Sequence, residues 1–67
     1  MKHPIIAQLR MERRGQQITQ LMLSEITGYH RNQFNQYETG RHSPKLETLE
    51  DWADALGFEL KLVKKQT

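Results

Sequence analysis

Apolar residues recur at helical spacing through most of this chain, and a glycine follows each of the four apolar stretches. Leu23 and Ile26, three apart, are the expected inner stripe of the second stretch. Phe34 and Tyr37 have the same spacing in the third. The pattern predicts helices over residues 4–14, 20–27, 30–38 and 44–56, so the fold should be mainly α.

Local signals predict where these helices begin and end. Thr19 is a good N-cap for the second helix, because its hydroxyl can accept a hydrogen bond from a free N–H of the first turn. Ser43 followed by Pro44 gives a similar signal for the fourth helix. Gly28 ends the second helix, and about three residues remain before the third. These two helices should therefore meet at a tight turn.

The pattern changes after residue 57, where apolar and polar side chains alternate. Three apolar positions define the period of a half-buried strand: Phe58, Leu60 and Leu62. We therefore expect a helical domain over residues 1–57 and a strand with a basic tail over residues 58–67. No other segment reads as a strand. Pairing with the same strand of a second subunit would therefore supply hydrogen-bond partners for the backbone N–H and C=O groups of residues 58–62. A frayed tail lying on its own monomer is the alternative.

Size and composition narrow the classes of protein. A chain of 67 residues makes one domain, and it buries only about 60% of the surface that its unfolded form exposes. It has no cysteine, hence no disulfide and no thiolate metal site, and no apolar run reads as a secretory signal or a membrane span. A bacterial-type cytoplasm, with its nucleoid, is the expected location.

Charge is divided unevenly along the chain. Residues 1–42 carry six Lys and Arg against three acids, residues 43–60 carry one Lys against five acids, and residues 61–67 add three Lys. The net charges are +3, −4 and +3. The N-terminal part should therefore accept a polyanion, whereas the outer face of the fourth helix should be repelled by phosphates.

The third predicted helix has an unusual polar face. If Phe34 and Tyr37 point inward, Asn32, Asn35 and Gln36 lie on the opposite side, flanked by Arg31 and Gln33. An ordinary solvated face favours Glu and Lys, whereas Asn is a poor helix former. Asn and Gln can form paired hydrogen bonds to adenine, and Arg to guanine, in the DNA major groove. This composition favours a helix that contacts base edges.

The run from residue 18 to 41, ITQLMLSEITGYHRNQFNQYETGR, resembles the helix-turn-helix of the lambda-repressor-like (Xre) family. The matching positions are Gln20, Leu23, Ser24, Gly28, Glu38 and Gly40. The likeness covers roughly residues 5–57. It implies a domain of four to five helices that binds double-stranded DNA.

The resemblance also implies site residues. Base or near-base contacts fall on Arg31, Asn32, Gln33, Asn35 and Gln36. Phosphate contacts fall on Gln20 and Arg41, with Lys45, Arg14, Lys64 and Lys65 as weaker candidates. Where the family usually has Ser or Thr before the third helix, this chain has His30, which either caps the helix, approaches a phosphate or is simply exposed. Either Arg10 or Arg13 would pair with Glu38.

These features predict a sequence-specific transcription regulator, most simply a repressor. The resemblance implies a phage, a mobile element or a toxin–antitoxin operon as its genetic setting. We expect a two-fold homodimer on an inverted repeat whose half-sites lie about 10 base pairs apart. The residues expected at the dimer contact are Trp52, Phe58, Leu60 and Leu62.

A module that neutralises a protein partner such as a toxin, through the acidic fourth helix, is the alternative function. An enzyme is not expected, because the chain has no glycine-rich phosphate loop and no clustered acid–base pair. No cofactor or metal is predicted either, since His3, His30 and His42 lack metal-ligand spacing.

Overall fold

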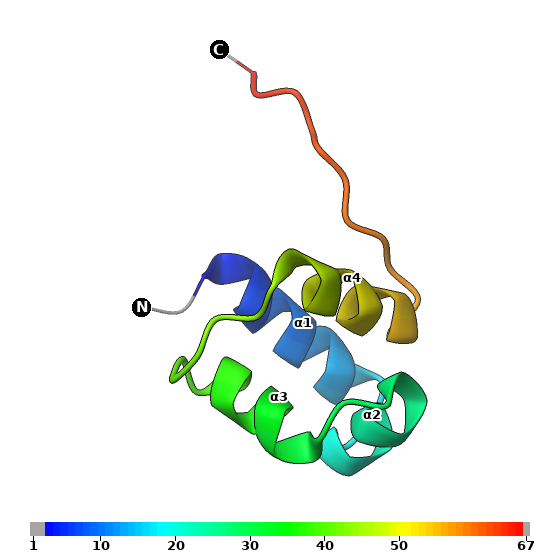
Figure 1. Ribbon diagram of the computed structural model, residues 1–67. Helices are drawn as coiled ribbons and strands as arrows, with labels where there is room; N and C mark the ends of the chain where they lie inside the picture. Colours follow the sequence, from blue (N-terminus) through cyan, green and yellow to red (C-terminus); the bar gives the residue numbers. More distant parts are fainter. Residues whose placement is uncertain (1–2, 67) are drawn as a thin grey trace.

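A computed structural model describes residues 3–66. This part of the chain folds into four helices, which are α1 (Pro4–Gly15), α2 (Gln20–Thr27), α3 (Arg31–Glu38) and α4 (Leu46–Ala55). Figure 1 shows the helices gathered into one body, with α1 behind α3 and α4 and with the C-terminal segment extending away from them. The all-helical architecture confirms the predicted class, and the number of helices agrees with the predicted four.

Each of the first two helices begins at a residue that accepts a hydrogen bond from the first turn. The Nδ1 atom of His3 accepts from the N–H of Ile5 at 3.1 Å, and Pro4 occupies the first turn of α1. The hydroxyl of Thr19 accepts from the N–H of Met22 at 3.1 Å, which confirms the predicted cap of α2. The capping side chains therefore determine where α1 and α2 begin.

The core is built around aromatic rings from α3 and α4. Phe34, Trp52 and Leu23 are the largest fully buried side chains. The rings of Phe34 and Trp52 pack edge to face with centroids 5.3 Å apart, a geometry that the ring quadrupoles favour. Around this centre lie Ile6 and Leu9 of α1. The core thus holds α3 by its inner face and leaves the opposite face outside.

The inner stripe of α2 differs from the prediction. Leu23 is buried as expected, but Ile26 is 57% exposed. The stripe continues instead at Thr27, four residues after Leu23. The Thr27 hydroxyl donates to the Leu23 carbonyl at 2.8 Å. Ile26 lies to one side of this stripe and faces outward.

The start of α4 is also corrected. The helix begins at Leu46, with Lys45 as an N-cap that forms no side-chain hydrogen bond, so Ser43 does not cap it. Lys45 is extended, with φ −70° and ψ 158°, which stops the helix from continuing back to Ser43. Pro44 consequently lies in the connection between α3 and α4.

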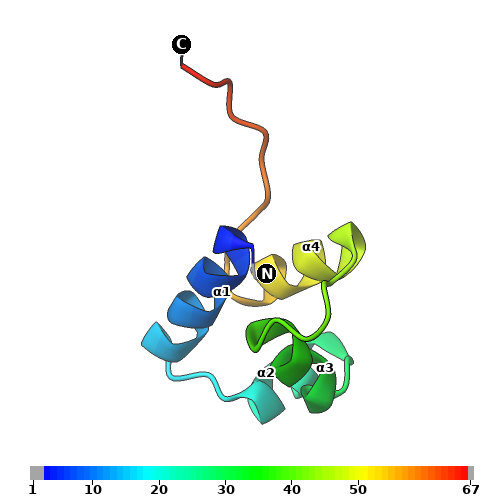
Figure 2. The ribbon, with the colours of Figure 1, turned by 90° about the vertical axis from the view of Figure 1, so that its left-hand side faces the viewer.

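The predicted C-terminal strand is not seen within residues 58–66, which form no strand ladder, although the N–H of Phe58 donates to the carbonyl of Ala53 at 2.8 Å. A strand requires ladder hydrogen bonds, and the described part of this chain offers no second strand to supply them. Figures 1 and 2 show this segment leaving the end of α4 on the side of the body opposite to α3. Leu60 still packs against the core, whereas residues 61–66 are exposed.

Candidate nucleic-acid interface

The turn between α2 and α3 is short and closely hydrogen-bonded. Gly28 has φ +83°, a left-handed conformation that side chains rarely adopt, and its N–H donates to the carbonyl of Ser24 at 2.8 Å. The N–H of Tyr29 donates to the hydroxyl of Thr27 at 3.3 Å. With His30 these residues span the whole link, as predicted, and they set α3 at a defined angle to α2.

His30 is the N-cap of α3. Its Nδ1 atom accepts from the N–H of Asn32 at 3.1 Å, while the side-chain oxygen of Gln33 accepts from the backbone N–H of His30 at 3.0 Å. Together these bonds form a capping box with histidine in place of the usual hydroxyl residue. Capping was one of the roles predicted for His30, and the side chain is exposed.

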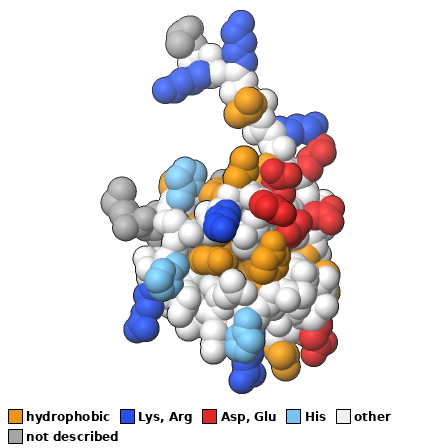
Figure 3. All heavy atoms as spheres, in the orientation of Figure 1, with side chains coloured by type: hydrophobic (Ala, Val, Ile, Leu, Met, Phe, Trp, Pro, Cys, Tyr) orange, Lys and Arg blue, Asp and Glu red, His pale blue; other side chains and the backbone are white. Residues whose placement is uncertain are grey.

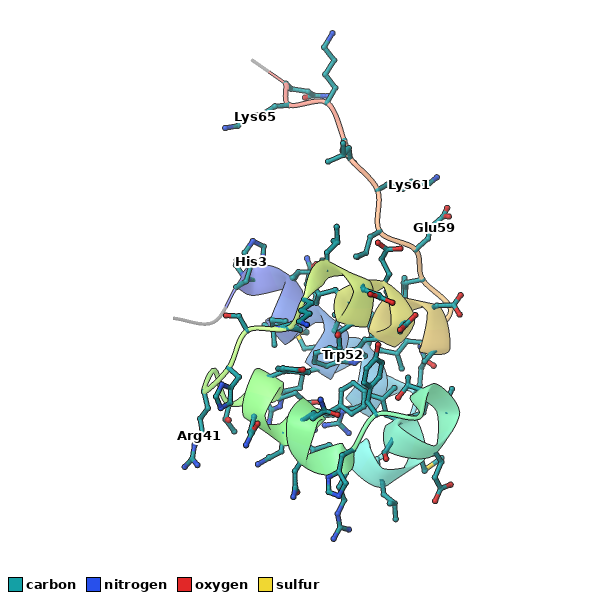
Figure 4. All side chains as sticks on the ribbon, in the orientation of Figure 1. His3, Arg41, Trp52, Glu59, Lys61 and Lys65 are labelled. Atoms are coloured by element: carbon teal, nitrogen blue, oxygen red, sulfur yellow. The ribbon has the colours of Figure 1, made fainter. Side chains whose placement is uncertain are left out.

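The residues predicted to contact bases divide into two groups on α3. Arg31, Asn32 and Asn35 are exposed, whereas Gln33 and Gln36 are half-buried. The opposite face holds Phe34, which is fully buried, so the amide face points out of the protein. Figure 4 shows side chains along α3 projecting away from the body at its lower edge. Gln33 differs from the others because its oxygen is already engaged in the capping box.

A buried polar cluster holds the C-terminal end of α3 against α1. The guanidinium of Arg13 donates to both carboxylate oxygens of Glu38, at 2.8 and 2.9 Å, and to the carbonyl of Ile18 at 2.6 Å. Arg10 lies 3.5 Å from Glu38, but its side chain is 45% exposed. Arg13 is therefore the principal partner of Glu38, which resolves the alternative left open by the sequence.

Gln20, predicted to contact a phosphate, belongs to the same cluster. Its side-chain amide donates to Glu38 at 3.3 Å, and the residue is half-buried at the first position of α2. A long, weak hydrogen bond occupies one of its two amide hydrogens. The start of α2 is thus tied to the end of α3 through the Glu38 carboxylate.

Arg41 lies just beyond the opposite end of α3 from His30. Its backbone N–H donates to the carbonyl of Gln36 at 2.9 Å, and its side chain is exposed. Figure 4 shows the Arg41 side chain pointing away from the body, at the same lower side as α3. Lys45 is exposed as well, and it lines a shallow groove of about 470 Å³ together with Gln33 and Gln36. Its role as a weaker candidate for a phosphate contact stays a prediction.

Acidic side chains lie on a different part of the surface. The exposed acids of α4 are Glu47, Glu50, Asp51 and Asp54. In Figure 3 most of the Asp and Glu side chains gather at upper right, around α4 and the root of the C-terminal segment, while further acidic atoms lie at lower right. This separation of charge leaves the α3 edge accessible to a polyanion.

One hydrogen bond joins the acidic face to the turn. The hydroxyl of Tyr29 donates to the carboxylate of Asp51 at 2.7 Å, and this bond raises the pKa of the Tyr29 hydroxyl above its ordinary value of 10.0. The ring of Tyr29 also packs edge to face on Phe34, with centroids 6.1 Å apart. Tyr29 therefore connects the turn between α2 and α3 to α4.

The residues assigned to dimerisation differ in exposure. Phe58 and Leu62 are exposed and Leu60 is half-buried, whereas Trp52 is fully buried in the core of its own subunit. Trp52 therefore packs beneath the surface and offers no exposed area for a contact with a second subunit.

Within residues 3–66, no group of three His, Cys, Asp or Glu side chains lies close enough to hold a metal ion. No helix in this same range has the length and apolarity needed to cross a membrane.

Two consecutive helices with a three-residue turn, packed by buried apolar side chains and exposing the polar face of the second helix, define a helix-turn-helix domain. A family model described as a helix-turn-helix domain matches residues 7–65, and the chain belongs to this Xre-like family. No curated protein and no solved structure gives a match. The family indicates DNA as the partner of this domain, and its members are typically not enzymes.

Proposed function

We propose that this protein is a sequence-specific transcription regulator that reads an inverted-repeat operator as a homodimer and acts most simply as a repressor. The observation that carries the proposal is the exposed face of α3, where Arg31, Asn32 and Asn35 stand opposite the buried Phe34. These side chains can discriminate bases in a major groove. A bacterial-type nucleoid would be the corresponding location.

Each contact has a distinct role in the proposed complex. Arg31, Asn32, Asn35 and Gln36 would contact base edges, while Gln33 supports the cap and offers only its amide nitrogen. Gln20, His30, Arg41 and Lys45 would contact phosphates, which fix the register of the protein but carry no sequence information. Repression follows from occupancy, because a bound dimer blocks access to a promoter.

The homodimer would join two α3 helices through the C-terminal segments, whose apolar residues Phe58 and Leu62 are exposed. Two recognition helices on one face of a duplex enter successive major grooves about 34 Å apart. The operator should therefore contain half-sites separated by about 10 base pairs or a multiple of that distance.

Selection of bound duplexes from a random pool tests this function. A palindromic consensus is expected, and Asn32→Ala or Gln36→Ala should weaken discrimination at one position of each half-site by about 1–3 kcal/mol. Gln8→Ala is the matched control, because it removes an exposed amide from α1. Variants of α3 that keep the parent's preference among duplexes would contradict base reading by this helix.

A protein-neutralising module, such as an antitoxin, is the second candidate, and the exposed acids on α4 favour it. Salt titration separates the two functions. DNA affinity should fall steeply with added salt, because each phosphate contact releases counterions. A chain that binds DNA with no preference among duplexes but captures a basic protein through α4 would favour the second candidate.

A further inference from the structure

Two arginines of α1 approach the carboxylate of Glu38, although one of them already occupies both of its oxygens. Arg13 donates to the two oxygens at 2.8 and 2.9 Å. The Nε atom of Arg10 lies 3.5 Å from Oε1, the oxygen that also accepts from Arg13 and from Gln20. Two positive charges therefore meet one negative charge, and the cluster keeps an excess positive charge on Arg10.

Arg10 has donors left for a second acceptor. A guanidinium carries five N–H groups, and the distance from Arg10 to Glu38 is longer than a good N–H···O hydrogen bond. The Arg10 side chain is 45% exposed, whereas that of Arg13 is 10% exposed. An arginine that is oriented by a carboxylate and partly open to water is well arranged to bind an anion, and its planar fork suits the oxygens of a phosphate.

The cluster borders the face of α3 that is proposed to contact bases. Glu38 follows Asn35 by three residues, which places the two side chains about 60° apart around the helix. On the other flank, Gln33 and Gln36 line the shallow groove that also contains Lys45. A helix in a major groove has one sugar–phosphate strand along each of its flanks. The Glu38 cluster therefore lies on the flank where the second strand would run.

Arg10 and Gln20 are close enough to contact the same phosphate. Both approach Oε1 of Glu38, Arg10 with its Nε atom at 3.5 Å and Gln20 with its side-chain nitrogen at 3.3 Å. The two nitrogens can be no further apart than the sum of these distances, 6.8 Å. Two hydrogen bonds of about 2.9 Å to different oxygens of one phosphate can span that separation. Gln20 is also half-buried, so its position is fixed more closely than that of a free surface side chain.

We propose that Arg10 and Gln20 bind the same phosphate of the operator, and that Glu38 orients both donors. Arg13 neutralises Glu38 from the buried side, so the carboxylate does not repel the phosphate, and Arg10 supplies the attracting charge. The contact rests on the proposed function, to which it adds an arginine of α1. It positions α3 in the groove and carries no sequence information.

Replacing single phosphates of a selected operator duplex by neutral methylphosphonates tests the shared contact. In the parent, the replacement at the shared phosphate should weaken binding about eightfold at 0.1 M salt, the factor that a salt slope of about −0.9 per phosphate gives between 1 M and 0.1 M. The same duplex should weaken Arg10→Gln by less than about twofold, because that chain no longer carries the charge. Gln20→Ala should lose part of its sensitivity at the same phosphate. Fluorescence anisotropy measures each affinity.

Lys61→Gln is the matched control, because it removes the same charge from the segment that Figure 4 shows on the side of the body away from α3. It should keep the parent's sensitivity at every phosphate. Arg10→Gln should keep the parent's circular dichroism and base preference, which separates a phosphate contact from a purely structural role beside Glu38.

Two results would overturn the shared contact while leaving the proposed function intact. One is an Arg10→Gln chain with the parent's sensitivity at every phosphate, and the other is a loss of sensitivity at different phosphates in Arg10→Gln and Gln20→Ala. A parent chain with no preference among duplexes would instead contradict the proposed function, and the contact that rests on it would be wrong as well.

Discussion

Arg13 and Glu38 form a buried two-pronged ion pair that joins the end of α1 to the end of α3. Arg13 Nε lies 2.8 Å from one carboxylate oxygen and a terminal nitrogen lies 2.9 Å from the other, while the Glu38 side chain is only 3% exposed. Parallel hydrogen bonds of this kind fix orientation as well as distance. The pair therefore positions α3 from inside the fold.

Removing one member of this pair should destabilise the fold strongly. Glu38→Ala leaves the Arg13 charge buried without its carboxylate, and we expect a loss of about 3–5 kcal/mol in the free energy of unfolding, measured by urea denaturation. Arg10→Ala is the control, since that side chain is 45% exposed and should contribute less than about 1 kcal/mol. Equal losses in the two variants would contradict the assignment of Arg13 as principal partner.

Local chemistry made much of this fold predictable. The spacing of Phe34 and Tyr37 predicts an inward face for α3, and Phe34 is fully buried while Tyr37 is half-buried. The stop at Gly28 follows from a conformation that favours glycine, and the structure has φ +83° there. Both features depend on residues close together in the chain, so the sequence carries the information directly.

Other features depend on packing between distant segments. The choice between Arg10 and Arg13 requires the angle between α1 and α3, which no local pattern encodes. The C-terminal strand was predicted from alternation, but a strand exists only where a partner supplies hydrogen bonds. The contacts of α3 with bases and phosphates stay predictions for a similar reason, because their partner is another molecule.

Two glycines offer a matched test of backbone conformation. A Cβ added at Gly15 or at Gly28 would meet no atom within 4 Å, but only Gly28 has a positive φ, +83°. Gly15→Ala should stabilise the fold by up to about 1 kcal/mol, because the unfolded chain loses freedom. Gly28→Ala should destabilise it by about 1–2 kcal/mol, because alanine is strained in the left-handed region. Thermal unfolding measures both, and changes of the same sign would contradict the turn geometry.

The bond between Tyr29 and Asp51 should be visible in a titration. Its 2.7 Å length and the raised pKa of Tyr29 both reflect the neutral hydroxyl donating to a carboxylate. In a Tyr37→Phe background, which leaves Tyr29 as the single tyrosine, Asp51→Asn should lower the pKa of Tyr29 toward 10.0. Ultraviolet absorbance of the phenolate measures it. Asp54→Asn is the control, since Asp54 forms no bond with Tyr29.

The same bond determines the sign of a stability effect. Because the pKa of Tyr29 is raised in the folded state, its contribution to stability is complete below the unfolded value of 10.0 and is lost as pH rises through the folded value. Asp51→Asn should therefore reduce stability at neutral pH and make the remaining stability less sensitive to alkali. A parent chain whose stability is constant across this alkaline range would contradict the bond.

The cap at His30 should affect both stability and DNA binding, and two substitutions separate these effects. His30→Ala removes the acceptor for the N–H of Asn32 and should cost about 1 kcal/mol of stability. His30→Asn supplies a side-chain oxygen at the cap, so stability should stay near the parent's value. If the other ring nitrogen of His30 also donates to a phosphate, both variants should bind duplexes more weakly, because Ala has no donor and the shorter Asn amide does not reach as far as the imidazole nitrogen. Fluorescence anisotropy with an operator duplex measures the affinity. Parent-like affinity for His30→Asn would limit His30 to the cap, whereas weakened binding at unchanged stability would assign it a phosphate as well.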